Sequence, residues 1–438
     1  MAHETWIWSW GAGTRGQLAS AASSDSLEPL RLSSFANARP VGDGSTAFRP
    51  CASSILDMAC GGAHAAALLR EAGEEHAQVV TWGNGESGAL GHGKELGDVS
   101  APKIVELFHS INVCSLAAGW SHTAFVTECG ELYTCGSGSF GQLGHGDCEE
   151  RLLPCKVQSL SSRAVVKAAC GMRHTLVLTD TQGTHAKSAV YSFGASRRGQ
   201  LGLAELDVHG TERLSSQKIV KVSIPQEIKE WTGNQVVELA ANGDHSAAIT
   251  EGGCLYIWGR GFCGQSDLRI PTRASHPLRF CRVALGWNHG LALTDEDVLW
   301  AWGSNQRGQL GSIEGTQKEP SPTSVENFFK EGGCRDDSVI TCSADQYWPK
   351  MVRVHGLEGR KVVSLSAGSE HSAVFLEDGE LKVWGWGEHG QLGLGNTDDA
   401  PIPQIVILPG NLSKNEFTWR VICGSGFTFT VGEKSSNF

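Results

Sequence analysis

The sequence lacks several features that would point directly to a function. None of its fourteen cysteines forms a C-x-x-C pair, the spacing on which many zinc sites and redox motifs depend. No run of lysine or arginine exceeds two residues, and the formal net charge is −11. The sequence therefore lacks the cluster of basic residues that binds the phosphate backbone of a nucleic acid. No apolar stretch is long enough to span a membrane, and no helical periodicity of useful length appears. We therefore expect no direct nucleic-acid binding, no membrane span, no metal and no other cofactor.

The cysteines also indicate the redox environment of the protein. They are scattered without a disulfide framework, which is typical of a reducing environment. A strand-like pattern already begins at Trp6, so we expect neither a signal peptide nor a cleavable transit peptide before it. The sequence therefore predicts a cytoplasmic and/or nuclear location.

The sequence does contain one short pattern, repeated seven times. Each copy has Gly-x-x-His, then an aromatic residue followed by Gly, then Gly-Gln-Leu or a variant of it, at a period of roughly 50 residues. The histidines are His64, His122, His174, His245, His289 and His371, with Phe427 in the seventh copy. The aromatic-Gly pairs begin at Trp10, Trp82, Phe193, Trp258, Trp302 and Trp384, with Cys135 in the remaining copy. Self-similarity at this period indicates a repeat architecture.

Each copy is consistent with four short antiparallel strands, named A to D in chain order. In the clearest copy they are predicted at 113–118, 122–127, 131–135 and 154–160. Seven such units predict an all-β protein, a seven-bladed β-propeller of four-stranded antiparallel blades, in which residues 1–438 form a single domain. The repeats are placed at 6–69, 79–127, 131–179, 189–250, 254–294, 298–376 and 381–431.

The two ends of the chain are complementary. Residues 6–11 form a C strand without its A and B strands, and residues 421–431 form A and B strands without a C strand. Pairing these segments would complete one blade and remove the exposed edges of an open array. We therefore predict a ring closed by the N- and C-terminal strands.

Insertions interrupt the repeats at 33–54, 203–235 and 312–348. Loops of this length without a strand pattern are usually functional or disordered. Because strands alternate in direction, the A–B turns and the C–D connections share one face of the ring. The 312–348 insertion is a C–D connection, so it is predicted on the face that carries the Gly-x-x-His turns, which we call the GxxH face. The 33–54 insertion is predicted on the opposite face.

Two features resemble catalytic or cofactor motifs but recur at fixed repeat positions. Five copies match the dinucleotide fingerprint Gly-x-Gly-x-x-Gly, yet another turn follows each match rather than a phosphate-binding helix. The repeated histidines are interpreted as scaffold, with buried imidazoles that bond backbone groups at the blade turns. No catalytic residue is predicted, and the chain is not expected to be an enzyme.

The informative positions are the two variable residues between the Gly and the His of each turn. Tryptophan and arginine are typical anchors of protein interfaces, so these positions predict a partner surface. Its predicted members are Trp120, Met172, Arg173, Asp244, Trp287, Asn288 and Glu370, together with Trp348 of the 312–348 insertion. The alternative is that Trp120 and Trp287 simply cover the axial channel.

The combined motifs resemble the regulator of chromosome condensation repeat family over essentially the whole chain. Residues 141–146, Gly-Gln-Leu-Gly-His-Gly, and 171–175, Gly-Met-Arg-His-Thr, make the resemblance specific. It implies a seven-bladed propeller. Members of that family include a guanine-nucleotide exchange factor for the small GTPase Ran, a plant UV-B photoreceptor and interaction modules.

The two best-known activities place particular residues at the variable positions. The exchange factor uses an Asp and a His there, whereas this chain has Asp244 and Glu370 and no His. The photoreceptor has Gly-Trp-Arg-His-Thr in consecutive blades, whereas Trp120 and Trp287 lie in separate repeats and no Arg follows them. We therefore predict an intracellular scaffold or regulator that binds a protein partner on one face. Nucleotide exchange on a small GTPase is the alternative, UV-B photoreception is a third hypothesis, and the oligomeric state is left open.

Overall fold

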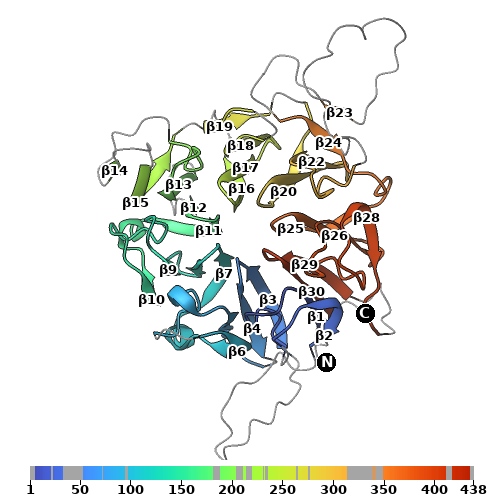
Figure 1. The fold of residues 1–438 in the computed structure, drawn as a ribbon. Helices are drawn as coiled ribbons and strands as arrows, with labels where there is room; N and C mark the ends of the chain where they lie inside the picture. Colours follow the sequence, from blue (N-terminus) through green and yellow to red (C-terminus); the bar gives the residue numbers. More distant parts are fainter. Residues whose placement is uncertain are drawn as a thin grey trace, which may run out of the picture.

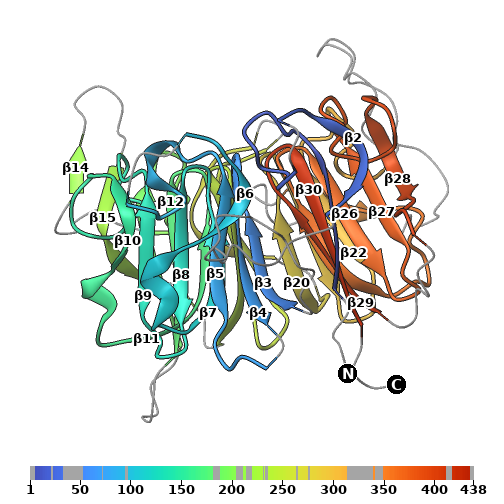
Figure 2. The ribbon, with the colours of Figure 1, turned by 90° about the horizontal axis from the view of Figure 1, so that it is seen from below.

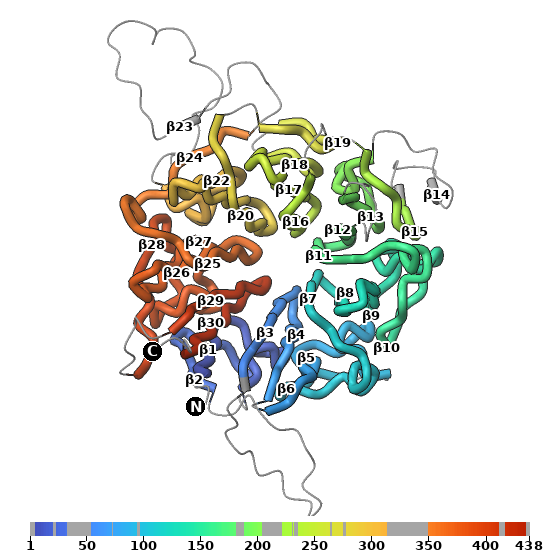
Figure 3. The backbone as a smooth tube through the Cα atoms, turned by 180° about the vertical axis from the view of Figure 1, so that it is seen from behind, coloured from blue at the N-terminus to red at the C-terminus, as the bar shows by residue number. Residues whose placement is uncertain are grey.

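The computed structural model is a ring of seven β-sheets around a central axis (Figure 1; seen from behind in Figure 3). It describes residues 5–20, 23–32, 53–71, 73–93, 97–180, 188–203, 211–213, 220–229, 231, 235–262, 265–274, 277–312, 339–340, 349–410 and 417–434. Within these residues the predicted seven-bladed propeller is confirmed. None of them forms a helix that is long and apolar enough to cross a membrane.

The first four blades follow one another along the chain, each with its A strand nearest the axis. Blade 1 consists of β3 (Ser53–Cys60), β4 (His64–Glu71), β5 (Gln78–Gly83) and β6 (Val99–Ile104). Blade 2 consists of β7 (Val113–Ala118), β8 (His122–Thr127), β9 (Leu132–Gly136) and β10 (Arg151–Lys156). Blade 3 consists of β11 (Ala164–Cys170), β12 (His174–Asp180), β13 (Ala189–Ala195), β15 (Val220–Ile228) and a short fifth strand, β14 (Thr211–Arg213). Blade 4 consists of β16 (Val236–Asn242), β17 (His245–Thr250), β18 (Leu255–Gly259) and β19 (Leu268–Arg273).

The remaining blades complete the ring. Blade 5 consists of β20 (Phe280–Leu285), β21 (His289–Thr294), β22 (Leu299–Gly303), β24 (Met351–Arg353) and a fifth strand, β23 (Val339–Ile340). Blade 6 consists of β25 (Val362–Ala367), β26 (His371–Leu376), β27 (Leu381–Gly385) and β28 (Ala400–Val406). Blade 7 consists of β29 (Phe417–Cys423), β30 (Phe427–Lys434), β1 (Thr5–Gly11) and β2 (Ser26–Arg31). Three single-turn 3₁₀ segments are described, η1 (Glu86–Gly88), η2 (Glu106–His109) and η3 (Gln158–Leu160).

Blade 7 is assembled from both ends of the chain, as predicted. Strand β1 pairs with β30 in antiparallel register from Thr5↔Glu433 to Gly11↔Phe427. The start of β1 and the end of β30 consequently lie on the same side of the ring (Figure 2). The pairing gives β30 a partner on each side and leaves no unpaired strand edge at the seam.

The core lies between blades rather than within them. Every residue of the B strand β8 is buried, and the same holds for β17, β21 and β26, because each B strand has a neighbouring blade on both faces. Trp82, Trp258 and Trp384 are also completely enclosed. Truncating a buried aromatic residue of this kind to Ala typically costs about 3–5 kcal/mol, so the repeated aromatic-Gly pair is a major source of stability.

The outer strands differ in detail from the prediction. In blade 2 the D strand was expected at 154–160, but the strand is Arg151–Lys156, and Gln158–Leu160 forms a 3₁₀ turn that buries Leu160. Within the predicted 203–235 insertion the chain forms β14 and β15. Most of the 33–54 insertion lies outside the described residues, as does the 312–348 insertion apart from Ser312 and β23.

Candidate functional site

The A–B turns and the C–D connections meet on one face because strand direction alternates. Strand β3 ends at Cys60 immediately before a Gly-x-x-His turn, and strand β5 of the same blade ends at Gly83, where its C–D connection begins. The same geometry recurs in every blade. The variable residues of the turns are therefore surrounded by C–D connections, which form the outer part of the GxxH face.

Backbone hydrogen bonds link the turns around the axis. The N–H of a variable residue donates to a carbonyl in the turn of the next blade. These bonds are Gly62 to Gly119 (3.1 Å), Trp120 to Gly171 (3.4 Å), Met172 to Gly243 (2.9 Å), Trp287 to Ser369 (2.8 Å), Ser369 to Ser425 (3.1 Å) and Ser425 to Gly61 (3.1 Å). Between blades 4 and 5 a side chain takes over: Asn242 stands where other turns have Gly, and its Nδ2 donates to the Leu285 carbonyl at 2.9 Å. The turns are therefore held as one rigid rim.

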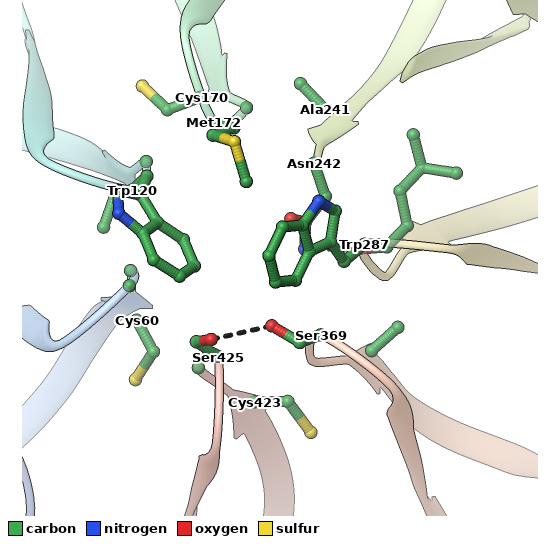
Figure 4. A pocket seen from close by; sticks show the side chains of 18 of the residues that line it. Cys60, Trp120, Cys170, Met172, Ala241, Asn242, Trp287, Ser369, Cys423 and Ser425 are labelled. Atoms are coloured by element: carbon green, nitrogen blue, oxygen red, sulfur yellow. Dashed lines mark hydrogen bonds between the residues drawn. The ribbon is translucent and has the colours of Figure 1, made fainter. Parts of the chain in front are cut away.

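Trp120 and Trp287 meet over the centre of this rim. Their ring centroids lie 5.4 Å apart with a 48° tilt, although one residue belongs to blade 2 and the other to blade 5. Figure 4 shows the two indoles across the opening, with Met172 on one side and hydrogen-bonded Ser369 and Ser425 on the other. The two residues lie in separate repeats of the sequence, but the turns of non-adjacent blades converge on the axis and bring the indoles into contact.

The tryptophan pair lines the mouth of a central cavity of about 200 Å³. Both indoles line this cavity, and Trp120 remains 44% exposed. Glycines make room for both indoles. A Cβ atom at Gly62 would lie 3.1 Å from Cδ2 of Trp120, and one at Gly243 would lie 2.6 Å from Cδ1 of Trp287. A rigid aromatic pair thus sits in the middle of the face and is only partly covered.

Two carboxylates flank Trp287, and neutral amides hold both of them. Gln200 Nε2 donates to Asp244 Oδ1 at 3.0 Å, and Asn288 Nδ2 donates to Glu370 Oε1 at 2.6 Å. The Oδ1 atom of Asn288 accepts from Arg260 Nη1 at 2.9 Å, so one hydrogen-bonded chain crosses blades 4, 5 and 6. Amide donors fix the carboxylates in place without neutralising their charge.

The other predicted surface residues lie farther from this centre or outside the described residues. Arg173 is exposed, and its guanidinium lies 4.6 Å from the centroid of the Phe140 ring. The Nζ atom of Lys221 lies 5.7 Å from the same centroid. Trp348 lies outside the described residues. The structure thus brings Trp120, Met172 and Trp287 together at the axis and places Arg173 outside them.

Sequence reasoning missed Arg260, Gln200 and Phe140. All three belong to C–D connections, which were interpreted as turn chemistry alone. A signal was available, because these connections were already predicted on the GxxH face. Arg260 follows the aromatic-Gly pair directly, where the other repeats have different residues, so it varies within a constant frame as the turn residues do.

The repeated histidines connect neighbouring blades. Each ring is buried, and in five cases Nε2 contacts the Ser or Thr hydroxyl that follows the histidine position of the next blade. The pairs are His64–Thr123 (2.9 Å), His122–Thr175 (3.0 Å), His174–Ser246 (2.9 Å), His289–Ser372 (2.8 Å) and His371–Thr428 (3.0 Å). These partners are side chains rather than the backbone groups that were expected.

The hydroxyls identify the tautomer. Each one donates its only proton to the carbonyl at the Gln position of the preceding blade, as Thr175 does to Gln142 at 2.8 Å. A hydroxyl that donates to a carbonyl must accept from the imidazole, so Nε2 carries a proton. Burial lowers the pKa of His64 to about 4 and the pKa values of the other five to about 3, which keeps them neutral near pH 7.

His245 is the exception. Its counterpart in blade 5 is Gly290, which has no hydroxyl, and neither ring nitrogen has a hydrogen-bond partner among the described side chains. Burial lowers the pKa of His245, and a backbone group of His289 acts in the opposite direction. Phe262 packs edge-on against the ring, with centroids 4.9 Å apart. At the histidine position the 4–5 interface therefore has apolar packing, whereas five other interfaces have a polar bond there.

These features define a class of seven-bladed propeller in which Gly-x-x-His turns, aromatic-Gly pairs and Gly-Gln-Leu segments join the blades. The chain belongs to the RCC1-like domain family, whose model matches residues 6–430. It is 29% identical to the ultraviolet-B receptor UVR8 of Arabidopsis thaliana, over 80% of this chain and 81% of that protein. It is 28% identical to the secretion-regulating guanine nucleotide exchange factor of Mus musculus, over 97% of this chain and 83% of that protein.

The fold is also that of a solved structure, Prp20p from Saccharomyces cerevisiae. The TM-score is 0.70 at 22% identity, and the match covers 100% of this chain and 93% of that one. That structure was described together with binding of Prp20p to Gsp1p and histones. The relatives of this chain thus include a guanine nucleotide exchange factor.

Proposed function

We propose that this chain is an intracellular scaffold or regulator that binds a protein partner on its GxxH face. The observation that carries the proposal is the Trp120–Trp287 pair, which sits at the centre of a rigid rim and is partly exposed. Interfaces concentrate their binding energy in a few central aromatic residues that are rigid before the partner arrives. Met172, beside the pair, adds an adaptable apolar contact.

The charges around the pair favour a partner with a basic patch. Asp244 and Glu370 are half-buried, and the groups that donate to them are the neutral amides of Gln200 and Asn288. The whole chain carries a net charge of −11. A basic partner would be guided to the face by charge and held by burial of the indoles.

A second candidate is nucleotide exchange on a small GTPase. It is favoured by the likeness to the mouse exchange factor, which extends over nearly the whole of this chain. Exchange requires no catalytic group, because it is enough to bind the nucleotide-free GTPase more tightly than the loaded one. Release of a fluorescent GDP analogue from a panel of small GTPases tests it, and the candidate fails if the chain accelerates release from none of them.

Affinity capture tests the main proposal. The wild-type chain and the Trp120→Ala/Trp287→Ala variant would be used side by side as baits in nuclear and cytosolic extracts. The proposal requires at least one partner that is retained by the wild type and lost by the variant while the thermal melts of the two baits agree. A set of partners that is the same for both baits would contradict it.

A further inference from the structure

Six of the seven described outer strands share a proline at one position. In each blade, the C-strand residue two positions before the Gly of the aromatic-Gly pair is paired with one residue of the outer strand. The proline is the residue directly before that outer-strand residue. These residues are Pro29, Pro102, Pro154, Pro225, Pro271 and Pro403. In blade 5 the same position is Met351, which precedes the Val352↔Ala301 pair. The outer strand of blade 5 is therefore the exception among the described blades.

The proline acts on the outer edge of the blade. In blade 1 the Val105 N–H points inward and donates to Val79 at 2.9 Å. Because N–H direction alternates along a strand, the nitrogen of Pro102, three residues earlier, faces outward. A proline there removes the donor that another strand would need, which is a known protection of sheet edges.

Blade 5 keeps that donor. The Val354 N–H donates inward to Leu299 at 2.9 Å, so by the same alternation the Met351 N–H faces outward. A strand is in fact added there: β23 pairs antiparallel to β24 with register Val339↔Val352 and Ile340↔Met351. This outer edge is open to pairing, and a two-residue segment of the same chain occupies it.

Blade 3 provides an internal control. Its fifth strand, β14, pairs with β15 from Thr211↔Val222 to Arg213↔Val220. The pairing ends three residues before Pro225, and no described strand continues it past the proline. The added strand of blade 5, by contrast, pairs with Met351 itself. Strand addition in this ring thus avoids the prolines.

We propose that the outer edge of β24 is a docking site for an extended segment of a protein partner, which adds as an antiparallel strand in place of Val339–Ile340. Strand addition gains affinity from main-chain hydrogen bonds, and a pairing of only two residues is a weak competitor. The residues next to the edge define the partner segment. Lys350 is exposed and Arg353 is half-buried, so the segment should carry β-branched apolar residues flanked by acidic ones. This site lies at the outer edge of the ring, and it stands independently of the partner surface on the GxxH face.

The first test removes β23 from the outer edge of β24, so that this edge is emptied. The Val339→Asp/Ile340→Asp variant of the full chain disfavours its own strand, and a fluorescein-labelled peptide of residues 335–341 serves as the probe. Fluorescence anisotropy should show binding to the emptied variant at least about tenfold tighter than to the wild type, a difference of about 1.4 kcal/mol. Equal binding to both proteins, or no binding to the emptied variant while its thermal melt is unchanged, would overturn the proposal.

A matched pair of substitutions then tests the outward N–H. In the emptied background Met351→Pro restores the residue found in the other outer strands and should weaken peptide binding at least about tenfold, whereas Met351→Leu should not. Hydrogen exchange provides a readout that does not depend on the folding of the proline variant. The peptide should slow exchange in residues 350–353 of the emptied variant, and unchanged exchange there at saturating peptide would contradict the proposal.

Discussion

The Nε2 atom of His289 lies 2.8 Å from the Ser372 hydroxyl of the next blade. That hydroxyl donates its own proton to the Gln309 carbonyl at 3.1 Å, so the imidazole is the donor. At the closing interface the equivalent residues are Phe427 and Ala65, which have neither donor nor acceptor and belong to one buried cluster. Six of the seven interfaces thus have either a complete polar pair or a complete apolar pair at this position, and His245 with Gly290 is the exception.

This relationship predicts a strong coupling between His289 and Ser372. Ser372→Ala should lower the free energy of unfolding by about 1–3 kcal/mol, because it leaves a buried N–H without an acceptor. His289→Phe should also destabilise the fold. The double variant reproduces the Phe427–Ala65 arrangement, so it should lose less than the sum of the two single losses. Urea unfolding of the four proteins measures the coupling, and strictly additive losses would show that the two side chains act independently.

The buried histidines predict acid sensitivity. Their pKa values lie near 3 to 4 in the folded chain against 6.5 when unperturbed, so below about pH 6.5 the unfolded state binds protons that the folded state excludes. The free energy of unfolding is therefore greatest above about pH 6.5, and it decreases progressively as the pH falls toward 3. Lowering the pH from 7.5 to 5.5 should cost about 1.4 kcal/mol per histidine.

The His289→Phe/Ser372→Ala variant provides the control for this pH effect. With one buried imidazole fewer, it should lose about 1.4 kcal/mol less than the wild type over the same pH interval. Urea unfolding at the two pH values gives both losses. If the variant and the wild type lost equal stability, another group would have to be responsible for the acid sensitivity.

The surroundings of Gly290 predict that Gly290→Ser, an apparently favourable substitution, destabilises the fold. By analogy with the other repeats, Gly290→Ser should give His245 its missing partner and stabilise the chain. The structure predicts the opposite, because a Cβ atom at Gly290 would lie 2.2 Å from Cζ2 of Trp302. We expect a loss of about 1–3 kcal/mol from this overpacking. Gly97→Ser is the control, since a Cβ atom there meets nothing within 4 Å. A raised melting temperature for Gly290→Ser would contradict the packing at this interface.

The chain is not expected to respond to UV-B light by changing its oligomeric state. Trp120 and Trp287 form an isolated pair, and the cation–π contacts of the described residues involve the rings of Trp6, Phe140 and Tyr191 instead. No cation–π contact among the described residues therefore involves either indole of the pair. Size-exclusion chromatography before and after irradiation tests this expectation, and conversion of a dimer to monomers would refute it.

Much of the fold could be predicted because its signals are local and repeated. The Gly-x-x-His, aromatic-Gly and Gly-Gln-Leu landmarks defined the blades, and the unpaired C strand at Trp6 predicted how the ring closes. The contact between Trp120 and Trp287 could not be derived in this way, because it depends on the width of the channel and on where blades 2 and 5 lie around it. The role of Arg260 was missed for a related reason, since its partner Asn288 belongs to another blade.

The central claim is that the Trp120–Trp287 pair anchors a protein partner, and the dissociation constant of a captured partner tests it most directly. Titration calorimetry would compare the wild type with Trp120→Ala/Trp287→Ala and with a control, Val166→Ala/Val237→Ala. Those valines are 45% and 50% exposed near the start of inner strands, at the opposite mouth of the channel. The account predicts a loss of roughly 2 kcal/mol or more on removal of either tryptophan, at least about thirtyfold for the double variant, and no change for the control. Unchanged affinity in the tryptophan variant, with its fold intact, would contradict the account and move the partner site away from the GxxH face.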